Sequence, residues 1–421
     1  MVIMGRKIFR EKFHKVVMKK VIKACKQSYF KYAFCLISLL CVFPFQSKAS
    51  SEDSVRISLL TCSPGSEIYA LFGHTALRYQ NMKTGMDVVF NYGMFDFHAP
   101  HFIWRYIKGE TDYQLGVTDY FYFEQEYSER NSSVYQQTLN LLPEEKDALF
   151  QILQKNYLPE NRVYRYNFFF DNCSTRPRDR VEECIKGKVT YTKNTSPLSF
   201  RDIVHEFTAG HDWAEFGIDL CLGSKADEII DYRLKMFAPY YLKEALTGAK
   251  IKANDGKERM LVSNAEEIVH RSPNKKTVES SYPSPLLTAW VLFVLVLLIT
   301  AYGYKKKKSF WGLDIVLFSM AGLAGCIIAF LVCFSQHPTV SPNYMLIVFH
   351  PLHLLYLPFM VWKAYKGKKD PYQLANLAVL TLFIVFFCLL PQKINLAVVP
   401  LALCLWIRSL NYVCLNYKRY K

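Results

Sequence analysis

The stretch that decides the fold is Tyr166–Asp179, YNFFFDNCSTRPRD. Its aromatic residues are typical of a buried strand, which ends at Asp171 and Asn172, a polar pair that can cap a helix. Cys173 then lies at the N-terminus of a helix that we expect to begin near Thr175. Unpaired N–H groups and the helix dipole there stabilise a thiolate, nearby arginines add positive field, and the same N–H groups can hold an oxyanion. A buried, inert cysteine is the alternative interpretation.

Positive charge is concentrated in two parts of this 421-residue chain, whose formal net charge is +16. Residues 1–32 carry +9 and residues 305–421 carry +11, so residues 33–304 are net negative at −4. A basic groove in the folded domain is therefore not expected, nor is a nucleic-acid partner. We interpret the excess charge as a determinant of membrane topology, which the 15% aromatic content also favours.

The twelve cysteines show no paired framework. Seven lie in apolar segments and one in the basic leader, so the folded domain contains only Cys62, Cys173, Cys184 and Cys221. In an oxidising compartment these four allow one or two disulfides, and a bond from Cys173 to Cys184 is the alternative to a reactive thiol. No C-x-x-C spacing indicates zinc, and we expect neither a metal nor a cofactor.

Hydropathy divides the chain into four parts. Residues 1–49 are a basic leader with a short apolar run, typical of a secretory signal cleaved near Ala49; an uncleaved anchor is the alternative. Residues 52–252 are long enough for one periplasmic α+β domain. Residues 253–284 are polar and are interpreted as a linker, and residues 285–421 are a transmembrane domain.

A meander of strands with helices beside it is predicted for the soluble part, which is an α+β pattern. The predicted strands are Val55–Cys62, Gly73–Tyr79, Asp87–Tyr92, Ser133–Leu141 and Val163–Phe170. The predicted helices are Pro143–Tyr157, Ser199–Thr208, Asp212–Cys221 and Ala226–Leu246, the last bent or broken at Pro239.

Five apolar spans form the predicted α bundle of the membrane half. They are Pro285–Tyr304, Trp311–Phe334, Tyr344–Trp362, Leu374–Leu390 and Leu396–Leu415. Basic segments follow the first, third and fifth spans, whereas the other two loops contain one lysine between them. Positive loops stay cytoplasmic, so we expect a multi-pass protein of the inner membrane whose soluble domain is periplasmic.

A thiol nucleophile needs a base, and the base needs a residue that orients it. His74 directly follows a glycine in LFGHTALRY, at the start of an apolar strand where another group can approach closely. Asn91 ends the next strand, and in a hairpin its amide can hydrogen-bond one ring nitrogen of His74 while the other nitrogen faces the thiol. The alternatives are a core histidine and an ordinary asparagine at a strand end.

Further polar residues are candidates for substrate binding. Strand alternation places Arg78 on the same face as His74, where it can hold a phosphate or carboxylate; a solvated arginine is the alternative. His350 and His353, in FHPLHLLYLP, share one helix face near the periplasmic end of the third span. They are candidates for lining a lipid path or for simple packing.

The ordered motifs TCSPGSE, FGHTALRYQN, FNYGMFDF and FDNCSTRPRD, followed by helices and five spans, resemble the Bacteroidetes family named for the Lnb N-terminal periplasmic domain. Its members look like lipoprotein N-acyltransferases. The order of these residues is also similar to that in the circularly permuted NlpC/P60-like, papain-type fold. The strand with the histidine comes first, and the cysteine follows later, where a strand leads into a helix.

The resemblance implies Cys173 as nucleophile and His74 as base, with Asn91 as a third member although relatives often place a second histidine there. Asp171 and Asn172 are expected to support the thiol and the oxyanion. The implied reaction moves an acyl chain from a membrane phospholipid, through a cysteine thioester, to the α-amine of a diacylated lipoprotein.

Acyl transfer needs water kept from the thioester, and lipid-facing aromatic residues at Phe168–Phe170 or Met236-Phe237 are candidates for that role; plain core is the alternative. Two other function classes stay open. A membrane-tethered NlpC/P60-like cysteine amidase or peptidase predicts a water-filled groove and activity in a domain cut free near residue 280. A non-enzymatic membrane sensor predicts that Cys173→Ala folds and signals normally.

Overall fold

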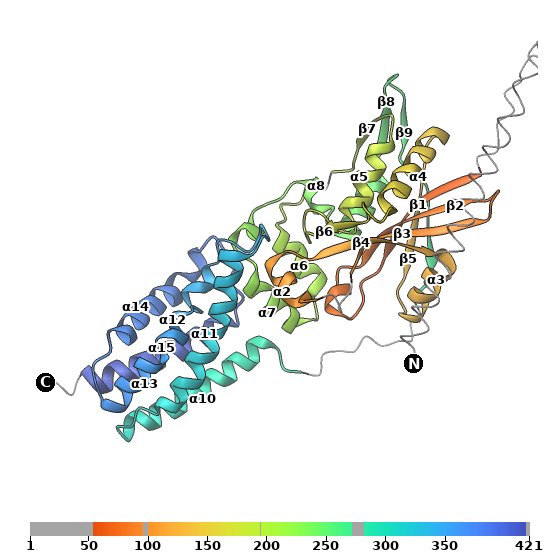
Figure 1. Ribbon diagram of the computed structural model, residues 1–421. Coiled ribbons are helices and arrows are strands. Elements are labelled where there is room, and N and C mark those ends of the chain that lie inside the picture. Colours follow the sequence, from red (N-terminus) through yellow and green to blue (C-terminus); the bar gives the residue numbers. More distant parts are fainter. Residues whose placement is uncertain (1–53, 96–99, 194, 272–281, 418–421) are drawn as a thin grey trace, which may run out of the picture. The chain divides into compact units, whose positions relative to one another are not determined.

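A computed structural model describes residues 54–95, 100–193, 195–271 and 282–417. The predicted leader and its signal or anchor lie outside these residues. The described chain contains an α+β domain followed by a set of apolar helices, which confirms the predicted fold class (Figure 1).

A seven-stranded antiparallel sheet forms the frame of the α+β domain, in the order β10-β5-β1-β2-β3-β4-β6. Its strands are β1 (Val55–Cys62), β2 (His74–Asn81), β3 (Met86–Met94), β4 (Asp112–Asp119), β5 (Val134–Leu139), β6 (Val163–Arg165) and β10 (Val262–Val269). The strands β2 and β3 pair as the predicted hairpin, whose turn contains Gly85 in the left-handed region at φ 67°. The first strand coincides with its predicted bounds.

Helices cover both faces of this sheet. On one face, α4 (Pro143–Tyr157) and α5 (Thr175–Cys184) pack with β1 and β2 in a core that includes Leu59, Leu77 and Leu149. On the other face, α3 (Tyr120–Glu129) contributes Phe123 and Tyr127 to a smaller cluster (Figure 1). Strand alternation sends successive side chains of β2 to these two clusters in turn.

Two parts of the α+β domain differ from the prediction. The interval between β3 and α4 also holds α2 (Phe102–Lys108), β4 and α3, which were not predicted. The predicted linker at 253–284 is wrong over its first half, because β9 (Glu258–Met260) pairs with β8 (Lys250–Ala253) and β10 pairs with β5. The strand β10 is an exposed edge of the sheet, and half of its side chains are exposed. Its sequence therefore lacks the apolar alternation from which a strand is predicted.

The rest of the α+β domain is mainly helical. Its elements are η1 (Ile68–Ala70), β7 (Gly187–Thr190), α6 (Phe200–Thr208), α7 (Asp212–Cys221), η2 (Ser224–Asp227), α8 (Tyr232–Lys235) and α9 (Pro239–Thr247). The helix predicted over 226–246 is therefore three separate pieces, and the last begins at Pro239, where proline is compatible with a first turn.

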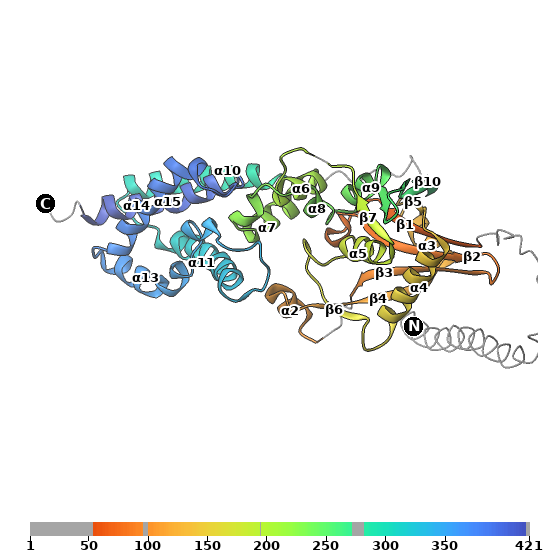
Figure 2. The same cartoon turned by 90° about the horizontal axis from the view of Figure 1, so that it is seen from above.

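Four helices of the described chain are long and apolar enough to cross a membrane, or five if a bent pair counts as one span. They are α10 (Pro285–Lys305), α11 (Trp311–Phe334), α14 (Pro371–Phe386, continued by η4, Phe387–Leu389) and α15 (Val398–Tyr417). The bent pair is η3 (Tyr344–Ile347) with α12 (Leu352–Leu355), then α13 (Leu357–Lys366), at 70°. In Figure 2, α15 lies beside α10 and α14.

Polar contacts join the α+β domain to loops between the apolar helices. Asn343 donates from Nδ2 to the carbonyl oxygen of Leu220 at 2.9 Å. Gln392 donates from Nε2 to the carbonyl oxygen of Leu222, also at 2.9 Å. Both amide side chains are buried, and leaving such a group without a partner costs about 1–3 kcal/mol. The domain is therefore bonded to the membrane half and not only tethered to it.

Candidate active site

Asn172 fixes the turn that carries the thiol. Its Oδ1 accepts the backbone N–H groups of Ser174 and Thr175, each at 2.9 Å, so it caps α5, which begins at Thr175 as predicted. Its Nδ2 donates to the carbonyl oxygens of Phe168 and Phe237 at 2.7 and 2.8 Å. One buried side chain thus holds the strand end, the helix start and a distant segment in a single arrangement.

Cys173 is held between β2 and β3 at the end where these strands stop pairing. The β2–β3 ladder runs only as far as Leu77 opposite Phe90. Beyond it, the backbone N–H of Thr75 hydrogen-bonds to the Cys173 thiol. A Cβ placed on Gly93, which has φ 89°, would lie 3.5 Å from Cys173 Cβ. That distance is an ordinary van der Waals contact, so the positive φ and not a lack of room favours glycine at 93, and the cysteine turn packs directly against this strand.

His74 and Asn91 form the hydrogen bond that the hairpin predicted, from His74 Nε2 to Asn91 Oδ1 at 3.3 Å. An amide oxygen can only accept, so Nε2 carries the proton and Nδ1 carries the lone pair of a base. The nitrogen that donates to the sulfur belongs to Thr75, the next residue. Thr75 Oγ1 also lies 3.0 Å from Ser174 Oγ, so the start of β2 and the cysteine turn are in contact.

The pair is electrically neutral at rest. Burial raises the pKa of the Cys173 thiol, although hydrogen bonds from the Thr75 backbone and the Ser174 side chain lower it in part. Burial also lowers the pKa of His74 to about 4, against the opposing effect of the Asn91 hydrogen bond. Desolvation disfavours both charged forms, so the thiol and the imidazole are both neutral at rest.

The expectation that nearby arginines stabilise a preformed thiolate is therefore wrong. Each guanidinium is paired with a carboxylate: Arg176 with Asp171, Arg178 with Asp179, which Arg233 shares, and Arg180 with Glu183. The charges cancel locally, and burial dominates at the sulfur.

Two residues expected to support an oxyanion have other contacts. Asp171 accepts Nε and Nη2 of Arg176 at 2.6 and 2.7 Å, and both oxygens of its carboxylate are used. The amide of Asn172 donates to two carbonyl oxygens, as described above. These side chains position the turn and are not free donors for an oxyanion. Sequence reasoning missed Thr75 and Gly93, although a glycine at a strand end is a known signal for close approach.

Two family models match this chain. The model for the Lnb N-terminal periplasmic domain matches residues 44–206, and the model for the Lnb transmembrane domain matches residues 277–420. The chain belongs to the Lnb family. A search of the curated proteins found no match, and neither did a search of the solved structures.

Membership of the Lnb family agrees with a multi-pass membrane protein that carries a periplasmic domain. The α+β domain holds both His74 and Cys173, and the apolar helices follow it in the chain. The likeness to a permuted NlpC/P60-like fold stays a prediction.

Arg78 of this Lnb-family chain is not available to a substrate. Its Nε and Nη2 donate to the two carboxylate oxygens of Asp87 at 2.8 and 2.6 Å, and its Nη1 donates to Gln136 Oε1 at 2.9 Å. Its guanidinium carbon lies 3.2 Å from the ring centre of Tyr120. The carboxylate that Arg78 binds is the protein's own, which corrects the predicted binding role.

His350 and His353 of the third span are stacked, with ring centres 3.8 Å apart, so they do share one side of the chain. His353 is fully buried; its Nε2 donates to the carbonyl oxygen of Val348, and its Nδ1 accepts the hydroxyl of Tyr372 at 2.7 Å. Tyr372 is in the first turn of α14, which follows a lysine-rich loop.

The predicted periplasmic position and lipid contact are therefore wrong for His353. The span is broken between α12 and α13, where Pro358 lacks the N–H group that would continue the helix. His350 lies before α12, and its buried Nδ1 has no hydrogen-bond partner among the described residues.

The aromatic residues expected to face lipid beside the site are mostly core. Phe169, Met236 and Phe237 are at most 6% exposed, and Phe168 packs against the same cluster. Only Phe170 is substantially exposed, at 41%. Plain core, the alternative interpretation, is correct for this group.

The four cysteines of the folded domain, Cys62, Cys173, Cys184 and Cys221, are free thiols. No disulfide therefore links Cys173 to Cys184 in the structure. Burial raises the pKa of Cys62 strongly, and the same cause raises the pKa of Cys184 to about 12. Of the four, Cys173 is the one that lies just before the N-terminus of a helix, whereas Cys62 is the register partner of His74 at the end of β1.

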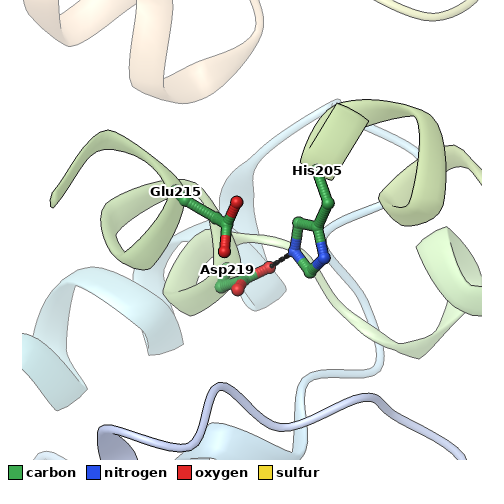
Figure 3. Close-up of side chains that lie close together, drawn as sticks. All are labelled: His205, Glu215 and Asp219. Atoms are coloured by element: carbon green, nitrogen blue, oxygen red, sulfur yellow. Dashed lines mark hydrogen bonds and ion pairs between the residues drawn. The ribbon is translucent and has the colours of Figure 1, made fainter. Parts of the chain in front are cut away.

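A cluster that the sequence did not reveal joins α6 to α7. Ligand atoms of His205, Glu215 and Asp219 lie within 4.8 Å of one another, and Figure 3 shows the two acids on one helix and the imidazole on another. His205 Nε2 lies 2.9 Å from Asp219 Oδ1, which raises the pKa of His205. The four-residue spacing of the acids places them on one helix face, which is the signal that could have found them.

The donor set suits a metal ion in type, but its partners argue against one. Asp219 Oδ1 also accepts Nη1 of the fully buried Arg201 at 2.6 Å, and Asp219 Oδ2 accepts Nδ2 of Asn395 at 2.9 Å. A cation bound here would meet the positive guanidinium and would have to displace the existing bonds. We interpret the cluster as part of the junction between the α+β domain and the loop after η4.

Proposed function

We propose that this protein is a cysteine-dependent lipoprotein N-acyltransferase of the inner membrane. One observation supports the proposal: the turn that carries the thiol contacts the start of the strand whose neutral imidazole is hydrogen-bonded to an amide, in a domain bonded to apolar helices. The thiol is that of Cys173, and the imidazole of His74 is oriented by Asn91. The donor is a membrane phospholipid and the acceptor is the α-amine of a diacylated lipoprotein.

The first half-reaction forms a thioester. Nδ1 of His74 takes the Cys173 proton while the sulfur attacks the carbonyl carbon of the phospholipid ester. The resulting oxyanion collapses, the ester C–O bond breaks, and the imidazolium returns its proton to the leaving alkoxide. The products are an acyl-enzyme and a lysophospholipid, and His74 is neutral again.

The second half-reaction moves the acyl chain to nitrogen. The lipoprotein amine attacks the thioester carbon, and His74 takes a proton from that amine as the C–N bond forms. The C–S bond then breaks and the sulfur recovers the proton, which regenerates thiol and imidazole. A neutral resting pair suits both half-reactions. His74 is unprotonated, and so can take a proton, when the Cys173 thiol attacks the ester and again when the amine attacks the thioester.

The connection to the membrane half favours transfer over hydrolysis. Asn343 and Gln392 bond the domain to loops of the membrane helices, so the domain that carries the thiol is held at the bilayer in which donor and acceptor both lie. Restricting the reactants in this way raises their effective concentration. The alternative, a membrane-tethered amidase or peptidase, does not need a substrate that lies in the bilayer.

The test is mass spectrometry of lipoprotein N-termini from cells whose only copy of this protein is Cys173→Ala. We expect diacylated lipoproteins that lack the N-acyl chain. Cys221→Ala is the matched control, because Cys221 is another free, partly exposed thiol of the same domain. Fully triacylated lipoproteins in the Cys173→Ala strain, with no second enzyme present, would contradict the proposal.

The covalent intermediate has its own test. Purified full-length protein is incubated with phospholipid but without acceptor, and the peptide containing Cys173 is searched for the mass of a fatty acyl group. We expect the adduct to disappear when a diacylated lipopeptide is added. Release of free fatty acid without an adduct would indicate simple hydrolysis.

A further inference from the structure

The short helix α2 has an apolar surface that the described residues leave largely uncovered. Five of its seven residues are apolar or aromatic, yet none is buried. Ile103 is 75% exposed, Trp104 is 54% exposed and Tyr106 is 51% exposed. Such a contiguous apolar surface on a small element marks an interaction site.

Hydrogen bonds to backbone carbonyl oxygens of α2 hold this helix at the end of a membrane-spanning helix. The backbone N–H of Gln336 donates to the carbonyl oxygen of Lys108, and the hydroxyl of Ser335 donates to the carbonyl oxygen of Ile107, both at 2.9 Å. Ser335 and Gln336 directly follow α11, which ends at Phe334. The topology places this end of α11 on the periplasmic side.

Side chains continue the same connection. His337 lies with Nε2 3.0 Å from the carbonyl oxygen of Tyr106. Trp104 packs on Phe330 in the last turns of α11, with ring centres 4.7 Å apart. The exposed residues of α2 are thus held at the depth at which the apolar helix leaves the bilayer. Tryptophan and tyrosine are enriched at that depth in membrane proteins.

We propose that α2 lies in the outer-leaflet interface of the membrane that α11 spans, with lipid covering Ile103, Trp104 and Tyr106. The occupant of this surface is the bilayer itself, because α2 continues directly from a surface that lipid already covers. A soluble protein partner would have to approach within the headgroup layer. A short amphipathic helix with aromatic residues on its apolar face is suited to this position.

The surface extends toward the catalytic end of the sheet. The ring of Phe95 lies 5.8 Å from that of Phe102 in α2 and 6.1 Å from that of Tyr69 in η1, which is 57% exposed. The segment η1 ends four residues before His74, and Phe95 follows Asn91 by four residues. Apolar groups therefore lie in the sequence segments next to both site residues.

An aromatic column then joins α2 to the thiol. Phe95 packs on Tyr113 at 5.1 Å, and Tyr113 stacks on Tyr166 at 4.0 Å. A Cβ on Gly93 would lie 3.6 Å from Tyr166 and 3.5 Å from Cys173. A second inference rests on the proposed function. The membrane-contacting helix and the nucleophile are parts of one packed unit, so the donor lipid enters at α2 on its way to Cys173.

Fluorescence quenching tests the membrane contact. An environment-sensitive fluorescent amino acid replaces Ile103 in the full-length protein, which is reconstituted in nanodiscs with lipids brominated on their acyl chains. Met82 is the matched control position, since it is 59% exposed in the β2–β3 turn. That turn is roughly 25 Å from the end of β3 that leads to α2.

We expect quenching at position 103 to exceed quenching at position 82 at least threefold. Equal quenching at the two positions would overturn the proposal. The measurement is repeated in the Cys173→Ala background, where the same ratio is expected because lipid contact needs no chemistry. A failed acyl-transfer assay therefore leaves this test intact, and failed quenching leaves the acyl-transfer test intact.

The second inference has a separate test. Ile103→Asp introduces a charge that the interface disfavours, and we expect at least a fivefold lower rate of thioester formation on Cys173 in nanodiscs. Met82→Asp is the control and is expected to keep the rate of the unmodified protein. An unchanged rate for Ile103→Asp, in a protein where the same fluorescent amino acid placed at position 106 shows reduced quenching, would overturn the assignment of α2 as the entry point of the donor.

Discussion

The neutral resting state of the thiol and imidazole can be measured by the pH dependence of alkylation. The pKa of Cys173 lies above its ordinary value of 9.0, so fewer than about one in a hundred molecules carry the thiolate at pH 7. Because only the thiolate reacts with iodoacetamide, the rate should rise about tenfold per pH unit from pH 6 to 9. A pre-ionised pair would instead react about 100-fold faster at pH 7, with a flat profile.

The assay follows the Cys173 peptide by mass spectrometry during timed alkylation of the full-length protein. His74→Gln is the informative variant. The pKa of His74 is lowered to about 4, so above pH 5 the imidazole carries no charge that could stabilise a thiolate, and the variant should keep the same slope. The peptide containing Cys221 reports whether the reagent and the fold are unchanged.

A flat profile in the unmodified protein that becomes sloped in His74→Gln would refute this reasoning. It would mean that the two side chains form an ion pair despite their burial. The acyl-transfer proposal would survive that result, but the proton would have to move before the donor binds.

Three further variants test the positioning of the site. Asn91→Ala removes the hydrogen bond to His74 and should lower the rate of lipoprotein acylation about fivefold, as expected for one bond of about 1 kcal/mol; an unchanged rate in membranes would contradict its orienting role. Asn172→Ala should lower the free energy of unfolding by about 1–2 kcal/mol in thermal melts, and Asn172→Asp should lose at least as much, because its second carboxylate oxygen would face the carbonyl oxygens to which Nδ2 donates. Arg78→Met leaves Asp87 without its partner, so it should lower the free energy of unfolding by about 1–3 kcal/mol without raising KM for phospholipid; the reverse pattern would restore a binding role.

Elements with strong local signals could be predicted closely. The bounds of β1, α4, α7 and α11 coincide with those expected from the sequence, because apolar periodicity, a first-turn proline and a long apolar run are all local properties. The strand β10 was missed because it is an exposed edge with polar side chains. It is recognisable only through its pairing with β5.

The candidate site likewise has some properties that follow from local sequence and others that depend on tertiary packing. The identities of Cys173, His74 and Asn91 follow from their neighbours in the sequence, and the hairpin that brings the latter two together follows from the loop between two short strands. The ionisation of the thiol does not, because desolvation depends on what packs around it.

Sequence alone determined that this chain has an exported α+β domain before a set of apolar spans, and which thiol and imidazole are candidates. The partners of its charged and aromatic residues were decided only by the tertiary structure. Arg78 meets Asp87, and α2 meets residues more than 200 positions away at the end of α11. The reason is physical: a side chain's charge and exposure are set by neighbours in space, and long-range packing leaves no periodic signal in the chain.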